Sequence, residues 1–358
     1  MRDKVSLLYI SIAAATLGGV SSVQAQTTGE RAGEEGEVVR EARPSQSVEN
    51  VFREEHALFS DRLTIEPGIN YSYSDRSQLA LRGFLALDAI FLGEINLDSV
   101  ESHITTFDFN TRYGITDRIE VGVNLPFVYR SSTYQSIGAG GSTEANIESS
   151  VDEAGIGDIS LSLSYRLLPE TAERPDLVWN FGIRAPTGTD PYGIALRSVP
   201  GSNENLNVPD ELPTGNGVWG VNTGVSFLKT LDPAIVFANL GYTYNFEESF
   251  DDISASDGDQ PGDVKLGDTI RAGFGTAFAL NESFSLSLSY SHEYIQQSET
   301  TRGGVTRKVV GSDANVGVLS LGGTYALSDS TSIVTSLGVG LTDDASDISL
   351  TFRMPLQF

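Results

Sequence analysis

The sequence predicts an all-β protein, a transmembrane antiparallel up-and-down β-barrel of about 12 strands. Three observations lead to this fold class. Segments of roughly ten residues alternate between apolar and polar side chains, as the strands of outer-membrane barrels do. Their connections alternate between short and long, which places turns on one side of the membrane and loops on the other. A secretory leader precedes them.

Residues 1–25 are the first predicted domain, a signal peptide. Arg2 and Lys4 give it a positive start, residues 5–20 are mostly apolar, and Val23-Gln24-Ala25 is a small-x-small cleavage site. The chain has no cysteine, so a lipid anchor on cysteine and a disulfide are both excluded.

Residues 26–62 are predicted to be a periplasmic segment. Residues 27–43 are rich in Gly, Glu and Arg, which is typical of a flexible linker. Apolar residues then recur at helical spacing and predict a short amphipathic helix: Val48, Val51, Phe52, Leu58 and Phe59. We expect this N-terminal helix to cap the barrel rim. Alternatively, the helix plugs the barrel or joins copies of the chain. In the second case the protein would be a homo-oligomer.

Residues 63–358 are the predicted barrel domain. A period of two places the apolar residues of each strand on one face and the polar residues on the other. Twelve segments follow this pattern: 63–73, 107–115, 119–130, 159–167, 177–184, 219–227, 239–246, 270–278, 284–294, 319–327, 333–341 and 348–358. An even number of strands puts both termini in the periplasm.

Residues 75–103 leave the strand number open. Within them, residues 79–97 are mostly apolar and contain Gly83 and Gly93. This stretch is either a bulged extension of the second strand or an extra hairpin, which would raise the count to about 14.

The connections divide into two groups by length. Short turns are predicted at 116–118, 231–233, 281–283 and 328–330, with a medium connection at 169–176. Long loops are predicted at 131–155, 187–215, 247–265 and 298–314. Tyr and Trp gather near the strand ends, as they do at membrane interfaces. The bacterial outer membrane is therefore the predicted location.

The last strand carries a predicted assembly signal. Its apolar face ends with Phe352, Met354, Leu356 and Phe358. A terminal Phe on the lipid face resembles the strand that the barrel assembly machinery reads. We therefore expect this machinery, outer-membrane lipid and lipopolysaccharide as partners.

Charged residues on the polar faces are the candidate lumen-lining residues. Two interpretations stay open: they set an electrostatic field and a constriction, or they pair with each other and keep the lumen from collapsing. The candidates are Glu66, Asp108, Arg112, Glu120, Arg130, Arg166, Arg184, Arg271, Glu293 and Arg353.

The composition excludes several functions. A net charge of -25 argues against nucleic acid as a partner, because phosphate binding needs clusters of Lys and Arg. The acidic loops attract cations, but the spacing of their carboxylates matches no calcium motif, so solvated loops are the preferred interpretation.

The sequence gives little support for catalysis. Ser291, His292 and Glu293 are adjacent on a strand, and neighbouring residues of a strand point to opposite faces. His292 therefore forms no catalytic pair with Ser291 or Glu293. We expect no enzyme activity, cofactor or metal.

Several short segments resemble an outer-membrane transporter family named for the MetA pathway of phenol degradation. They are Glu66-Pro67-Gly68, residues 112–120, Leu125-Pro126-Phe127, residues 155–159, residues 185–188 and Gly241-Tyr242. The resemblance covers residues 63–358 and implies a barrel for small, aromatic or hydrophobic compounds. The N-terminal helical segment also resembles, more distantly, the functional-amyloid export channel of pseudomonads.

The sequence thus predicts a passive outer-membrane channel for small solutes. One alternative is a secretion pore for an amyloid-like or surface polypeptide. The other is a non-conducting surface or adhesin barrel.

Overall fold

The computed structural model describes residues 63–86, 89–136, 147–199, 207–232, 234–254 and 258–358, and the side chains of 77–98, 136 and 147 lie outside the description. The predicted signal peptide, linker and N-terminal helix fall outside these residues. The described part of the chain contains no helix that is long and apolar enough to cross a membrane.

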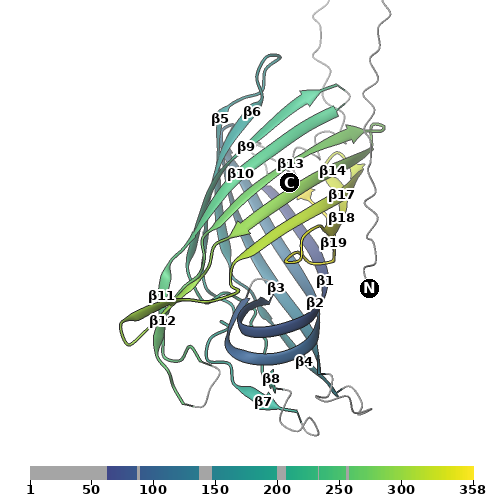
Figure 1. The fold of residues 1–358 in the computed structure, drawn as a ribbon. Helices are drawn as coiled ribbons and strands as arrows, with labels where there is room; N and C mark the ends of the chain where they lie inside the picture. Colours follow the sequence, from purple (N-terminus) through teal and green to yellow (C-terminus); the bar gives the residue numbers. More distant parts are fainter. Residues whose placement is uncertain (1–62, 87–88, 137–146, 200–206, 233, 255–257) are drawn as a thin grey trace, which may run out of the picture. The chain divides into compact units, whose positions relative to one another are not determined.

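The described residues form a closed antiparallel barrel (Figure 1). Its strands are β1 (Leu63–Ala86), β2 (Ala89–Thr116), β3 (Ile119–Ser136), β4 (Ile147–Ile156), β5 (Ser160–Leu168), β6 (Asp176–Arg184), β9 (Gly220–Leu231), β10 (Ala234–Asn245), β13 (Thr269–Ala279), β14 (Phe284–Ile295), β17 (Ala314–Ser328), β18 (Thr331–Gly340), β19 (Ile348–Arg353) and β20 (Leu356–Gln357).

The wall has twelve strands, as the sequence predicts. β4 and β5 both pair with β3 and are two parts of one wall strand. β19 and β20 both pair with β1 and form another. Each wall strand pairs with its neighbour in the chain, and β1 closes the ring on β19 with Ile69 opposite Phe352.

The alternation of side chains explains why these segments fold as barrel strands. On β10, Leu240 and Tyr242 are exposed on the outer face, while Asn239 and Gly241 point inward. Apolar side chains cover the outside of the wall, which suits a hydrocarbon environment. In that environment every backbone group needs a partner, and only a closed sheet provides one for each strand.

The two ends of the barrel differ. We call the end with the short connections, such as Ser328 to Thr331, the turn end, and the opposite end the loop end. Leu63 and Phe358 both lie at the turn end, where the N–H of Phe358 donates to the carbonyl of Leu63 at 2.9 Å. Pro355 interrupts the last strand, but Phe352 and Leu356 still face outward opposite Ile69 and Ile65.

Residues 75–103 add no wall strand. β1 and β2 continue past the barrel as one hairpin up to Ala86 and Ala89, with a register shift between Arg82 and Phe84. The prediction of an extra hairpin with about 14 strands is therefore wrong, and the stretch extends both strands rather than the second alone.

Much of the predicted loop sequence forms strands. β3 and β4 continue as a hairpin through most of 131–155. β11 (Glu247–Phe250), β12 (Gly262–Lys265), β15 (Glu299–Arg302) and β16 (Val305–Lys308) form a separate sheet, which we call the loop sheet, and β7 (Leu196–Ser198) pairs with β8 (Asn207–Pro209). These strands escaped prediction because they lack the apolar face that lipid requires.

The inner wall is apolar at one place near the turn end. Leu228, Ile235, Phe237 and Ala277 are buried together on β9, β10 and β13. Ile235 and Phe237 share the inward register with Asn239, so the simple rule of polar residues inside fails at this end of β10.

Candidate functional site: a cavity in the barrel lumen

The connection between β6 and β9 runs across the loop end of the barrel. We call residues 185–199 and 207–219 the crossing loop. Val208 and Leu212 of this loop pack against Tyr134 of β3 and Val151 of β4. Another part of it packs against the loop sheet, where Tyr192 and Val218 lie with Ile253, Val264 and Leu266. The loop thus joins the wall at β3 and β4 to the loop sheet that follows β10.

Asp158 ties the crossing loop to the wall between β4 and β5. Its carboxylate accepts the N–H of Gly188 at 3.1 Å on one oxygen and the N–H of Asn216 at 2.9 Å on the other. The Nε of Arg184 lies 3.8 Å from the same group. The chain is closely packed here: a Cβ on Gly215 would lie 2.9 Å from the Cα of Gly188 and 2.3 Å from Oδ1 of Asp158. Only glycine fits at that position.

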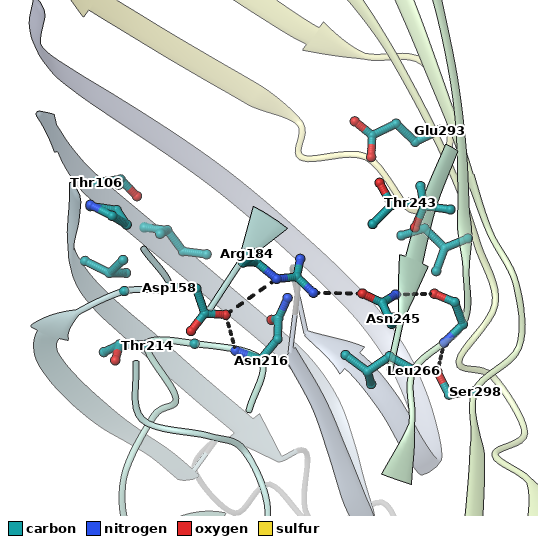
Figure 2. Close-up of a pocket in the computed structure, with 18 of the residues that line it drawn as sticks. Thr106, Asp158, Arg184, Thr214, Asn216, Thr243, Asn245, Leu266, Glu293 and Ser298 are labelled. Carbon is teal, nitrogen blue, oxygen red and sulfur yellow. Dashed lines mark hydrogen bonds and ion pairs between the residues drawn. The ribbon is translucent and has the colours of Figure 1, made fainter. Parts of the chain in front are cut away.

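Hydrogen bonds continue from Arg184 on β6 past β9 to Asn245 on β10, as Figure 2 shows. Nη2 of Arg184 donates to Asn245 Oδ1 at 2.8 Å, and Asn245 Nδ2 donates to the Gly267 carbonyl at 2.7 Å. The N–H of Gly267 then donates to Ser298 Oγ at 2.9 Å. β6, β10 and the segments before β13 and β15 are thereby held in one polar network.

A cavity of about 370 Å³ lies beside this network. Ile104 of β2 and Pro126 and Val128 of β3 form an apolar part of its lining. The rest is mainly polar and includes Arg130, Asp158, Arg184, Thr214, Asn216, Thr243, Asn245, Arg271, Glu293 and Ser298. A volume of this size falls in the range of small-molecule sites, roughly 300–1,000 Å³.

Arg184 and Arg271, two arginines of the cavity, form ion pairs, and Arg271 is the more exposed of the two. Its Nε lies 2.7 Å from Oε1 of Glu293, and the two residues are direct cross-strand partners on β13 and β14. The Arg271 side chain is 61% exposed, whereas the Arg184 side chain is 27% exposed. β13 lies six wall strands away from β2 and five from β3, so this ion pair faces the apolar lining across the lumen.

The structure places all ten charged candidates on the inward register and separates them into two groups. Arg130, Arg184, Arg271 and Glu293 line the cavity. The other six lie closer to the turn end: Glu66, Asp108, Arg112, Glu120, Arg166 and Arg353.

The second group consists largely of ion pairs. Glu66 lies 3.1 Å from Arg112 and 3.3 Å from Arg353, so it links β1 to both of its neighbours. Arg166 lies 3.0 Å from Asp176. Asp108 accepts a hydrogen bond from Asn124 at 3.1 Å, and Glu120 is buried.

Sequence reasoning placed Arg184 in the lumen but missed several other residues of the network. Asp158, Asn216 and Ser298 come from segments without strand alternation, so no facing rule assigns them to the lumen. The only signal was indirect: Asp158 belongs to the segment 155–159 that carried the family resemblance.

Tyr192 and Asp268, both outside the membrane-spanning segments, have shifted pKa values. Burial raises the pKa of the Tyr192 hydroxyl, which donates to the carbonyl of Asn216 at 3.2 Å. Burial acts to raise the pKa of Asp268 too, but hydrogen bonds from Lys265, Tyr242 and the N–H of Asn245 outweigh it and lower that pKa. Asp268 is therefore held as a carboxylate where the loop sheet joins the wall.

Within the described residues, no three His, Asp or Glu side chains gather closely enough to hold a metal ion. The acidic residues of the loops, such as Glu247, Asp252 and Asp263, instead lie on and around the loop sheet.

Comparison with solved structures finds similar barrels. The chain is similar to the COG4313 outer membrane channel from Pseudomonas putida F1, with 15% identity, a TM-score of 0.55, and coverage of 85% of this chain and 98% of that one. The translocator domain of the autotransporter NalP from Neisseria meningitidis matches at 10% identity and a TM-score of 0.44, covering 87% and 92%. The toluene transporter TodX from Pseudomonas putida matches at 13% identity and a TM-score of 0.38, covering 83% and 89%.

The family comparison agrees with the motifs seen in the sequence. The profile of one family, described as "Putative MetA-pathway of phenol degradation", matches residues 98–358, which is well over half of the chain. The resemblance predicted from short segments is confirmed, and the first structural match shows that the fold is that of an outer membrane channel. The chain belongs to the family of the "Putative MetA-pathway of phenol degradation".

Proposed function

We propose that this protein is a passive channel of the bacterial outer membrane for small solutes that are at least partly apolar or aromatic. The observation that carries the proposal is the cavity inside a closed, externally apolar barrel. Its volume suits a single small molecule, and its lining combines an apolar part with a ring of hydrogen-bonding groups.

The crossing loop supports small solutes over a polypeptide cargo. It contacts the wall at Tyr134 and the loop sheet at Val264, so it spans part of the loop end. A secreted chain would have to displace these apolar contacts, whereas a small molecule can pass beside the loop. Resident cofactors and enzyme chemistry form no part of the proposal.

The proposal also sets an orientation. The turn end, with Leu63 and Phe358, lies in the periplasm, and the loop end lies outside, as in other bacterial barrels. The outward residues Phe352, Met354, Leu356 and Phe358 act as the strand that the assembly machinery reads. Lipid and lipopolysaccharide surround the wall.

Conductance in planar bilayers tests the channel. The purified full-length protein is expected to give discrete current steps in potassium chloride. Arg184→Ala removes a side chain that lies in the lumen, so it should change the step size, whereas the outward substitution Leu240→Ala should leave it unchanged. Absence of current steps from protein that is shown to be folded would contradict the proposal and favour the non-conducting barrel.

A further inference from the structure

We propose that the lumen cavity binds small organic acids, with the carboxylate on Arg271 and an apolar body, such as a benzene ring, against Ile104, Pro126 and Val128. This inference rests on the proposed channel function and names the class of solute that the cavity favours.

The charge distribution around the cavity is the first argument. The whole chain carries a net charge of -25, yet three arginines line this cavity against the two carboxylates of Asp158 and Glu293. Both oxygens of Asp158 already accept backbone N–H groups of the crossing loop. The cavity is therefore locally cationic inside an acidic protein, which favours an anion at this one place.

The geometry of Arg271 is the second argument. Glu293 holds its Nε, and among the described residues this is its one ion pair or hydrogen-bond partner. The terminal edge of the guanidinium, with Nη1 and Nη2, is left for an incoming group, and the side chain is 61% exposed to the lumen. A guanidinium edge binds carboxylates through two parallel hydrogen bonds. Glu293 keeps the group in place without occupying that edge.

The apolar lining is the third argument. Ile104 and Val128 point into the lumen and are 8% and 7% exposed, although most inward residues of these strands are polar. Ile104 on β2 lies six wall strands from Arg271 on β13, and Val128 on β3 lies five wall strands from it. A solute with a charged head and an apolar body can thus contact both sides at once, whereas an inorganic anion contacts one side only.

Benzoate is the probe, and benzamide and acetate are its controls. Benzamide keeps the ring without the charge, and acetate keeps the charge without the ring. We expect benzoate to reduce the single-channel current in a concentration-dependent manner at millimolar levels, and the two controls to do so much more weakly. Equal block by benzamide, or equal block by acetate, would overturn the proposal.

Matched variants locate the site. Arg271→Gln should weaken benzoate block about tenfold, as expected for loss of one charge-assisted pair, and Arg271→Lys should recover only part of it. Arg302→Gln is the control, because Arg302 lies in the loop sheet, where it binds Gln260 and the carbonyl of Ile253. Unchanged block in Arg271→Gln would contradict the assignment.

Equilibrium binding separates this inference from the channel function. Calorimetric titration of benzoate into the detergent-solubilised protein needs no conduction. A protein that conducts but does not bind benzoate through Arg271 refutes the inference and leaves the channel intact. A protein that binds benzoate but does not conduct refutes the channel and leaves the site.

Discussion

Asp158 illustrates how a single residue controls the shape of the lumen. Its carboxylate is nearly buried, with 8% of the side chain exposed, and it accepts two backbone N–H groups of the crossing loop. A buried charged hydrogen bond contributes about 1.5–3 kcal/mol. The position of the loop therefore depends strongly on this one group.

Asp158→Asn should loosen the crossing loop. An amide offers one acceptor oxygen and turns an NH₂ group toward a backbone N–H, so one bond is lost and a donor is left unpaired. We expect the loop to become less stable by about 1–3 kcal/mol, seen as larger fluctuations of the single-channel current. Asp210→Asn is the matched control, since Asp210 pairs with Arg197 in the same loop but both side chains are nearly half exposed. Equal noise in both variants would argue against the role of Asp158.

The lowered pKa of Asp268 predicts that the stability of the loop end depends on pH. Because this pKa is lowered in the folded protein, the stabilising effect of Asp268 is fully present above the ordinary carboxyl value of about 3.9. That effect is lost as the pH falls through the lowered value. Hydrogen exchange of residues 262–268, corrected for intrinsic rates, should therefore rise below about pH 4. Asp268→Asn should show the faster exchange already at pH 7; exchange that is insensitive to pH in both proteins would count against this.

At the scale of elements, we expect the crossing loop to narrow the path through the lumen, because its residues Thr214 and Asn216 line the cavity. The loop makes two sets of apolar contacts, one with Tyr134 and Val151 and the other with Ile253 and Val264. These two clusters fix the loop more firmly than its short β7–β8 pair, which joins only three residues to three.

Shortening this loop tests that interpretation. Replacing residues 191–211 with a short Gly-Ser linker keeps the glycines that contact Asp158 and removes most of the crossing segment. The single-channel conductance should rise, because the narrowed path widens. As a control, insertion of the same linker at Gly303 and Gly304, in the turn between β15 and β16, should leave conductance unchanged. A loop-shortened protein that conducts like the parent would show that the constriction lies elsewhere.

Elements differ in how well the sequence predicts them. Wall strands such as β14 are predictable, because Leu286 and Leu288 alternate with Ser285 and Ser287 over a full membrane span. The loop sheet is not, because both faces of a strand such as β16 meet water and no alternation arises. The sequence predicts a long loop at 187–215, but not its position over the barrel, which depends on long-range contacts of Asp158 rather than on a local pattern.

At the scale of the molecule, closure of the ring depends on pairing between the first strand and the last. Glu66 on β1 bonds to Arg353 on β19 and to Arg112 on β2, and it is 5% exposed. Its position on the polar face was predictable from alternation. Its partners were not, because the register of β1 against β19 is set by closure of the whole sheet.

Glu66→Gln should weaken that closure. Glu66→Gln removes the carboxylate that two arginines share and so breaks two ion pairs at a buried position. Loss of one partner of a buried ion pair costs about 3–5 kcal/mol. The folded, heat-modifiable band on semi-native gels should disappear at a lower temperature than in the parent. Glu173→Gln, at an exposed position in the β5–β6 turn, should melt like the parent. Similar melting of both variants would refute the importance of Glu66 for closure.

The central claim is that alternate residues of each wall strand meet lipid and water, and cysteine scanning tests it most directly. The chain has no cysteine, so every introduced thiol reports alone. Single cysteines at 238–243 of β10 would be treated in lipid vesicles with a charged, membrane-impermeant thiol reagent. We expect positions 239, 241 and 243 to react and positions 238, 240 and 242 to be protected. Reaction at all six positions, or protection without alternation, would contradict the account.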